Sequence, residues 1–293
     1  MAFFYAFLTV AAWGTWLTPS QKVKFSGQQV RVLYVTVVNW LISGVIAATQ
    51  GLDTITPASF WLPFSGGIVW ALGGWAAFAA TDRIGLVRAY GVWSPLNILV
   101  SIVLGALFFK EFVSLNARAI LLLCISLGLI IGGVLLIIRS KESTEEEANR
   151  KSLAVGWICA IAAGVLWAAY YIPIRISETS MWVAAFPMGC GMLAGCLAIA
   201  LLSRKSLRLE SRSAYLLTAA SGVLWACGNY SMLLLVQAIG TGRGFTIAQL
   251  ALVVNAISGI YLLKDPPPKS RAARLALTGC VLATVGAITL GKL

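Results

Sequence analysis

The feature that most constrains this chain is a series of long apolar runs separated by short polar or turn-forming segments. A helix needs about 20 apolar residues to cross the hydrocarbon core of a bilayer, and ten runs approach that length. The runs are Phe3–Pro19, Val30–Thr49, Ser59–Ala80, Gly85–Phe109, Ala117–Ile138, Leu153–Pro173, Met181–Leu202, Ala214–Val236, Gly242–Leu263 and Ala272–Leu290. Barrel strands are excluded because the runs are too long and show no polar alternation. The sequence therefore predicts an all-α membrane protein with ten transmembrane helices.

The positive charge of the chain is concentrated on one set of loops. The formal net charge is +12, and most Lys and Arg residues follow the first, third, fifth, seventh and ninth runs. An excess of Lys and Arg marks cytoplasmic loops. We therefore expect a multi-pass protein of the cytoplasmic (inner) membrane with both termini outside. In such a protein the basic charge orients the chain in the lipid bilayer and does not indicate a nucleic acid partner.

The sequence lacks the residue sets that enzymes and metal sites require. It has no histidine, its six cysteines all lie inside apolar runs, and no two of them form a CxxC pair. Paired carboxylates and a Ser/His combination within the runs are also missing from the sequence. We expect no enzymatic activity, no metal and no cofactor.

The second half of the chain repeats the first. The phrase GGIVWALGGW at Gly66 returns as SGVLWACGNY at Ser221. At a shift of about 154 or 155 residues, further matches are Trp13 with Trp167, Trp70 with Trp225, Gly73 with Gly228, Arg88 with Arg243 and Lys110 with Lys264. Five spans is an odd number, so the second copy must enter the membrane from the opposite side. We expect two inverted five-helix repeats, residues 1–139 and 153–293, joined by a charged cytoplasmic linker at 140–152. Inverted repeats are typical of secondary transporters, which bind a small-molecule substrate between the halves and open alternately to each side.

Several of these motifs resemble one transporter family. They are WGTW at Trp13, GGIVWALGGW at Gly66, IGLVRAYGVWSPLNILVSIVLGALFFKEF from Ile84, SGVLWACGNY at Ser221 and IGTGRGFTIAQL from Ile239. Together they are similar to the glucose and ribose porter family of bacterial sugar uptake proteins, within the drug and metabolite transporter superfamily. The resemblance covers nearly the whole chain. It implies ten helices in two inverted repeats and sugar uptake coupled to protons.

Candidate substrate-binding residues are aromatic or amide side chains inside the spans. A sugar site needs flat aromatic faces for the ring and amides or hydroxyls for its hydroxyl groups, and polar groups within a bilayer are costly unless they are used. The predicted site residues are Trp70, Trp75, Asn97, Trp225, Asn229 and Gln249. The alternative is that the tryptophans are packing residues and that the amides bond neighbouring helices, an alternative that we prefer for Asn255.

Two arginines and the coupling ion leave alternatives open. Arg88 and Arg243 are either gates on opposite sides of the membrane or side chains that extend to each interface. The acidic residues lie at or beyond the ends of the runs, so uniport is an alternative to the proton coupling that the resemblance implies. The alternative function is export of a small metabolite or drug-like compound, although an exporter of cations needs a buried carboxylate that the runs do not contain.

Overall fold

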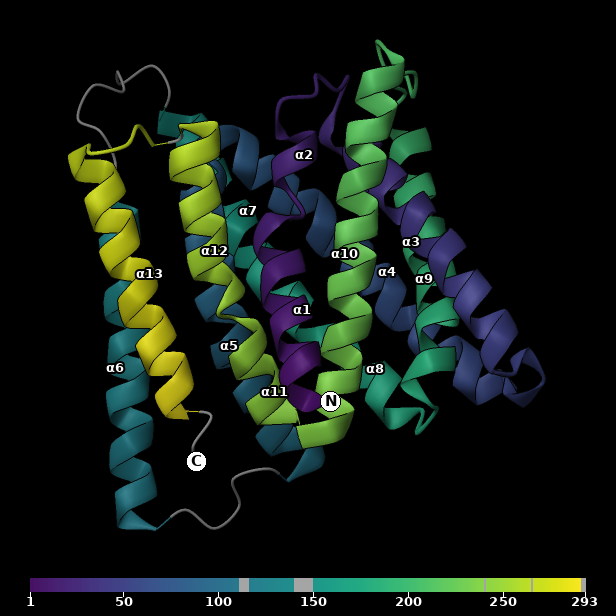
Figure 1. Ribbon diagram of the computed structural model, residues 1–293, viewed down its shortest axis with the longest axis horizontal. Helices are drawn as coiled ribbons and strands as arrows, with labels where there is room; N and C mark the ends of the chain where they lie inside the picture. The colour runs from purple at the N-terminus through teal and green to yellow at the C-terminus, as the bar shows by residue number, and fades with distance from the viewer. Residues whose placement is uncertain (111–115, 140–149, 240, 265, 291–293) are drawn as a thin grey trace.

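The computed structural model describes residues 1–110, 116–139, 150–239, 241–264 and 266–290, and within these ranges it contains helices and no strand (Figure 1). The α-helices are α1 (Ala2–Thr15), α2 (Thr18–Gln21), α3 (Gln28–Gln50), α4 (Pro57–Ile84), α5 (Leu86–Phe109), α6 (Ala117–Arg139), α7 (Arg150–Ala169), α8 (Tyr171–Ile176), α9 (Met181–Leu202), α10 (Arg212–Ile239), α11 (Thr241–Ala248), α12 (Ala251–Ile257) and α13 (Arg271–Leu290). A short 3-10 helix, η1, spans Leu52–Thr54, and a π-helix, η3, spans Ser258–Leu263. The all-helical prediction is thus confirmed for the described residues.

Within the described residues, eight helical segments are long and apolar enough to cross a membrane. They correspond to eight of the ten predicted spans, and α9 has the predicted bounds of the seventh run. The first run is divided between α1 and α2, because Pro19 lacks the N–H that would bond to the carbonyl of Thr15 and continue α1. The ninth run is divided at Gln249 and Leu250, between α11 and α12.

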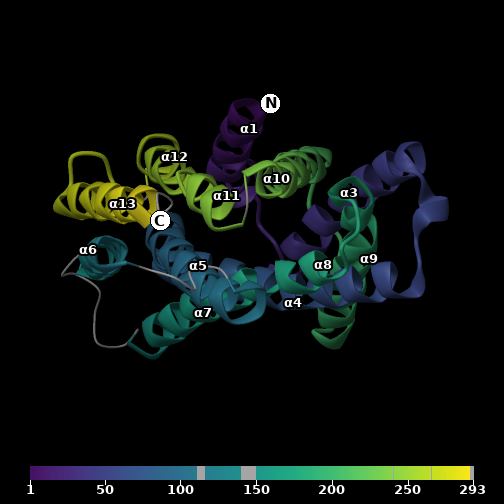
Figure 2. The ribbon, with the colours of Figure 1, turned by 90° about the horizontal axis from the view of Figure 1, so that it is seen from below.

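Helices from the two halves of the chain lie side by side throughout the molecule. Figure 2 shows α10 to α13 along one side and α4 and α7 along the other. At one edge α6 packs along α13, where a Cβ on Gly133 would lie 2.5 Å from the carbonyl oxygen of Gly279. Only glycine allows this close approach of the two backbones.

The packing partners of equivalent helices are exchanged between the halves. In the first half, α4 packs against α7 and α9, while its equivalent α10 packs against α1 and α3. Similarly, α5 packs against α7, and α12 packs against α1. Even the helix ends agree, since α5 and η3 both end at a lysine in the left-handed region, Lys110 with φ 53° and Lys264 with φ 59°. Each half therefore packs mainly on helices of the other half.

The repeated glycines explain why the same phrase occurs twice. A Cβ on Gly73 of α4 would lie 2.8 Å from Nε1 of Trp167, and a Cβ on Gly228 of α10 would lie 2.7 Å from Nε1 of Trp13. Each glycine thus accommodates an indole that comes from the other half of the chain. The repeated Trp-x-x-Gly pattern provides one tryptophan and the surface on which a second tryptophan packs.

Candidate functional site

A small cavity of about 40 Å³ lies among the central helices. Helices from both halves contribute to its wall. The lining residues are Trp13, Trp16, Trp70, Tyr90, Trp93, Asn97, Trp167, Tyr170, Trp225, Phe245 and Gln249. Most of them are aromatic, and none of these lining residues carries a charge.

The aromatic rings contact one another and form a continuous wall. Trp70 and Trp225, the repeated tryptophans, meet at a ring-centroid distance of 4.5 Å and an interplanar angle of 61°. Trp167 stacks on Trp70 at 5.9 Å and meets Trp93 edge to face at 5.3 Å. Contacts between aromatic rings in this distance range stabilise their relative placement. The wall therefore presents rigid apolar faces to the cavity.

The wall is built largely from pairs of equivalent positions in the two halves. Trp13 and Trp167 form one pair, Trp70 and Trp225 a second, and all four line the cavity. At the same shifts, Trp16 is equivalent to Tyr170 and Tyr90 to Phe245, and these residues also line it. The repeat that is visible in the sequence thus converges on one site.

Hydrogen bonds fix several groups of this wall. The indole of Trp167 donates to the carbonyl oxygen of Trp70 at 3.2 Å, and the hydroxyl of Tyr90 donates to the carbonyl oxygen of Trp13 at 3.2 Å. The hydroxyl of Ser94 donates to Oε1 of Gln249, which joins equivalent positions of the two halves. These bonds run between different helices, so the cavity depends on how the halves are packed together.

The predicted site residues are only partly brought together. Trp70, Asn97, Trp225 and Gln249 line the cavity. The other two predicted residues, Trp75 and Asn229, are not among its lining residues, and Trp75 is 45% exposed on α4.

Asn229 is buried next to the cavity wall. Its Oδ1 accepts a hydrogen bond of 3.5 Å from the hydroxyl of Tyr170, which lines the cavity. The amide therefore contacts the wall through this tyrosine. Asn255, which we expect to have a packing role, donates through Nδ2 to the carbonyl oxygen of Gly14 at 3.4 Å and joins α12 to α1.

The two predicted gating residues occupy equivalent places in their helices. Arg88 lies in the first turn of α5 and is half-buried. Arg243 lies near the start of α11, but its side chain is outside the described part of the structure. Arg88 is not among the residues that line the cavity.

Sequence reasoning missed part of the aromatic wall. Trp13, Trp16, Trp93, Trp167 and Tyr170 line the cavity but were not among the predicted site residues. The equivalence of Trp13 and Trp167 was a usable signal, because a repeated tryptophan pair at a second place suggests the same role as Trp70 and Trp225.

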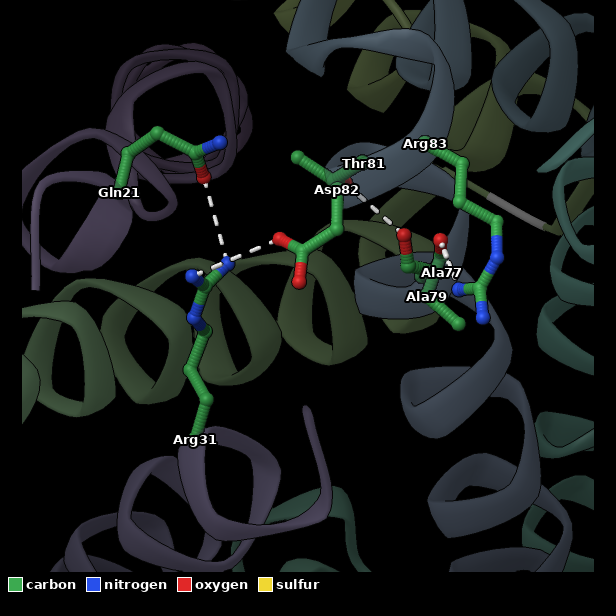
Figure 3. Close-up of polar contacts among 7 residues, drawn as sticks. All are labelled: Gln21, Arg31, Ala77, Ala79, Thr81, Asp82 and Arg83. Atoms are coloured by element: carbon green, nitrogen blue, oxygen red, sulfur yellow. Dashed lines mark hydrogen bonds and ion pairs between the residues drawn. The ribbon is translucent and has the colours of Figure 1, made fainter. Parts of the chain in front are cut away.

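An ion pair between a buried arginine and an exposed aspartate was also missed. Arg31 on α3, whose side chain is 4% exposed, lies 3.8 Å from a carboxylate oxygen of Asp82 near the end of α4. Figure 3 shows its guanidinium between Asp82 and Gln21, and Nη1 donates to Oε1 of Gln21 at 3.3 Å. The same guanidinium lies 5.0 Å from the ring centroid of Phe78, which meets Trp16 of the cavity edge to face at 5.4 Å. This cluster ties α2 and α3 to α4 near the cavity.

Metal-ligating groups do not gather anywhere in the described ranges. Among these residues no group of three or more His, Cys, Asp or Glu side chains could hold a metal ion, and the six cysteines are free thiols.

Known proteins resemble this chain in sequence and in fold. The sequence profile of the sugar transport protein family matches residues 4–293. A protein of Enterococcus faecalis that is named for sugar uptake is 26% identical over 293 residues, covering 99% of each chain. A protein of Priestia megaterium that is named for glucose uptake is 23% identical over 238 residues, covering 81% of each chain. One crystal structure of another protein superposes with a TM-score of 0.68 at 16% identity, covering 99% of this chain and 98% of the other, and this likeness supports the fold.

Proposed function

The chain belongs to the sugar transport protein family, and from that premise we propose that it takes up a sugar or a similar polyhydroxylated small molecule through the aromatic cavity. Its relatives are named for sugar and glucose uptake, and its apolar helices make it a multi-pass membrane protein. The proposal adds the site, the direction of transport and the mechanism.

The observation that carries the proposal is an aromatic, uncharged cavity with amides in its wall. Trp70 and Trp225 offer apolar faces for the carbon face of a sugar ring, while Asn97 and Gln249 offer hydrogen-bonding groups for its hydroxyls. A cation exporter would need a carboxylate in the site, and no lining residue carries one. The cavity therefore favours a neutral, hydroxylated ring over a cation.

We further propose that the chain forms ten helices in two inverted repeats, residues 1–139 and 153–293. The exchange of packing partners between α4 and α10 supports this arrangement, as does the convergence of equivalent residues on one cavity. The linker at 140–152 lies mostly outside the described residues. In such a construction the halves rock against each other and open the site to one side at a time.

The orientation and the coupling ion belong to the same proposal. The loop charges place both termini outside the cytoplasmic membrane. Proton coupling, which the family resemblance implies, predicts that an imposed pH gradient drives sugar accumulation in proteoliposomes. Equilibration without accumulation under the same gradient would indicate uniport.

The proposal assigns gating to Arg88 and Arg243, which lie in equivalent places near opposite ends of the membrane path. Replacing each residue by Gln is expected to slow transport in one direction more than in the other. Normal transport by both variants in both directions would remove them from the mechanism.

The experiment that tests the site is ligand binding by purified protein, measured by thermal shift and by direct titration with monosaccharides. Loss of an amide partner leaves a sugar hydroxyl unpaired, which costs about 1–3 kcal/mol, so Asn97→Ala and Gln249→Ala should weaken binding about tenfold or more. Trp225→Ala should weaken it more than Trp225→Phe. Trp75→Ala is the matched control, because Trp75 is exposed outside the cavity. Equal affinity in the parent and in the three alanine variants of cavity residues would place the site elsewhere.

A further inference from the structure

The two amides in the cavity wall share an arrangement that the proposed function does not require. The carbonyl oxygen of each accepts a hydrogen bond from a serine of α5. Ser94 donates to Oε1 of Gln249, and Ser101 donates to Oδ1 of Asn97 at 3.4 Å. Both serines are buried, 1% and 5% exposed, and neither is among the lining residues.

This arrangement follows from the geometry of α5. Ser94, Asn97 and Ser101 are spaced by three and four residues, so they lie along one face of the helix. Gln249 reaches this face from the other half of the chain, at the break between α11 and α12. A hydroxyl of the first half thus orients an amide of the second half.

The consequence concerns which end of each amide meets the ligand. An amide carries one acceptor oxygen and one donor NH₂ group. When a serine hydroxyl bonds the amide oxygen, the NH₂ group is left for the ligand, and it can only donate. The tyrosine hydroxyls of the wall differ, because Tyr90 and Tyr170 donate their protons to Trp13 and Asn229 and keep oxygens that can accept.

We propose that Ser94 and Ser101 are positioning residues that hold the Gln249 and Asn97 amides as donors, so that the site recognises its ligand through neutral acceptor oxygens. This inference rests on the proposed sugar function and deepens it. A sugar hydroxyl meets the requirement because its oxygen accepts from the amide. A protonated amine presents only donors, so it cannot pair with the NH₂ groups of Asn97 and Gln249.

The test compares monodeoxy and monodeoxyfluoro analogues of D-glucose, with protonated primary amines such as 2-aminoethanol included in the panel. Fluorine can accept weakly but cannot donate, whereas the deoxy position does neither. For the parent protein we expect at least one ring position where the fluoro analogue binds about tenfold more tightly than the deoxy analogue. Protonated amines should not bind.

Variants of Ser94 and Ser101 then distinguish a role in orienting the amides from a role in stabilising the fold. Ser94→Ala and Ser101→Ala free the amides to turn their oxygens toward the ligand. The ratio of the affinity for D-glucose to the affinity for the fluoro analogue should therefore rise about tenfold relative to the parent protein. Ser94→Thr keeps the donor and should retain the parent ratio. Ser126→Ala is the matched control, since Ser126 is fully buried on α6 and bonds only within its own helix, to Leu122. Ser94→Ala and Ser101→Ala act on different amides, so one remains informative if the other fails to fold.

The outcomes distinguish the two levels of the argument. A raised ratio of hydroxyl to fluoro affinity in Ser94→Ala or Ser101→Ala, with Ser94→Thr and Ser126→Ala unchanged, supports the inference. Unchanged ratios in both alanine variants, or binding of protonated amines by the parent, overturn it. Failure of the parent to bind any monosaccharide refutes the proposed function itself.

Discussion

Replacing Gly228 by alanine should damage both the stability and the ligand affinity of this protein. The new Cβ would overlap Cδ1 of Trp13 and would lie 2.7 Å from Nε1 and 3.0 Å from Cγ, whereas carbon atoms in favourable contact are about 3.5–4.0 Å apart. The Trp13 indole, which lines the cavity, must therefore move by more than about 1 Å. Overpacking of this kind costs about 1–3 kcal/mol, partly offset by about 0.5–1 kcal/mol from replacing a glycine within a helix.

Two further glycine substitutions serve as comparisons for Gly228→Ala. Gly73→Ala repeats the conflict in the other half, against Trp167, and should have a similar effect. Gly128→Ala on α6 is the control, because in the described part of the chain nothing lies within 4 Å of the new Cβ. Thermal unfolding in detergent and sugar titration would be measured for all three variants. If Gly228→Ala keeps the affinity and unfolding temperature of Gly128→Ala, the packing of Trp13 on Gly228 does not shape the site.

Three further predictions concern other parts of the fold. Asp82→Asn should lower the free energy of unfolding by about 1–3 kcal/mol because it leaves Arg31 buried without its counter-charge, and an additional Arg31→Met change should restore part of the loss in urea or thermal unfolding. Asn255→Ala should lower the stability by about 0.6–2 kcal/mol and leave sugar affinity unchanged, since its bond joins α12 to α1 outside the cavity wall; a loss of affinity at unchanged stability would contradict this. A cysteine at Lys205 should be labelled by an impermeant reagent from the cytoplasm and one at Asp53 from outside, and the reverse labelling would invert the proposed orientation.

The helical fold could be predicted from the sequence because its cause is local. An apolar run of about 20 residues must satisfy its backbone within itself when it lies in lipid, so length and hydropathy alone predict a helix. The positions at which helices break depend less on the local sequence. Pro19 gave a chemical reason for the end of α1, whereas the break at Gln249 and Leu250 carries no proline or other marker in the chain.

The candidate site was predictable where the repeat exposed it or where an amide lay inside an apolar run. Trp70 and Trp225 could be found because the same phrase occurs twice, and the structure brings them into contact. The packing of the Trp13 indole on Gly228 could not be predicted in this way, because a sequence repeat does not show which helices of the two halves contact each other. The contact between Arg31 and Asp82 could not be predicted for a similar reason. These two charged side chains are far apart along the chain and meet only because α3 packs on α4.

The positions at which the two halves differ explain how a duplicated scaffold acquires specificity. The equivalent pairs of the wall are aromatic on both sides, which gives a ring-shaped ligand similar surfaces from each half. The amides break this symmetry: Asn97 is equivalent to Leu252, and Gln249 is equivalent to Ser94. In the proposed mechanism, agreement between the halves lets them rock as equivalent bodies about a common centre, and their differences favour a single ligand orientation. A variant that made the polar groups symmetric, such as Leu252→Asn, should therefore relax discrimination between sugar epimers while keeping the aromatic contacts. Unchanged selectivity in that variant would show that the amides do not orient the ligand.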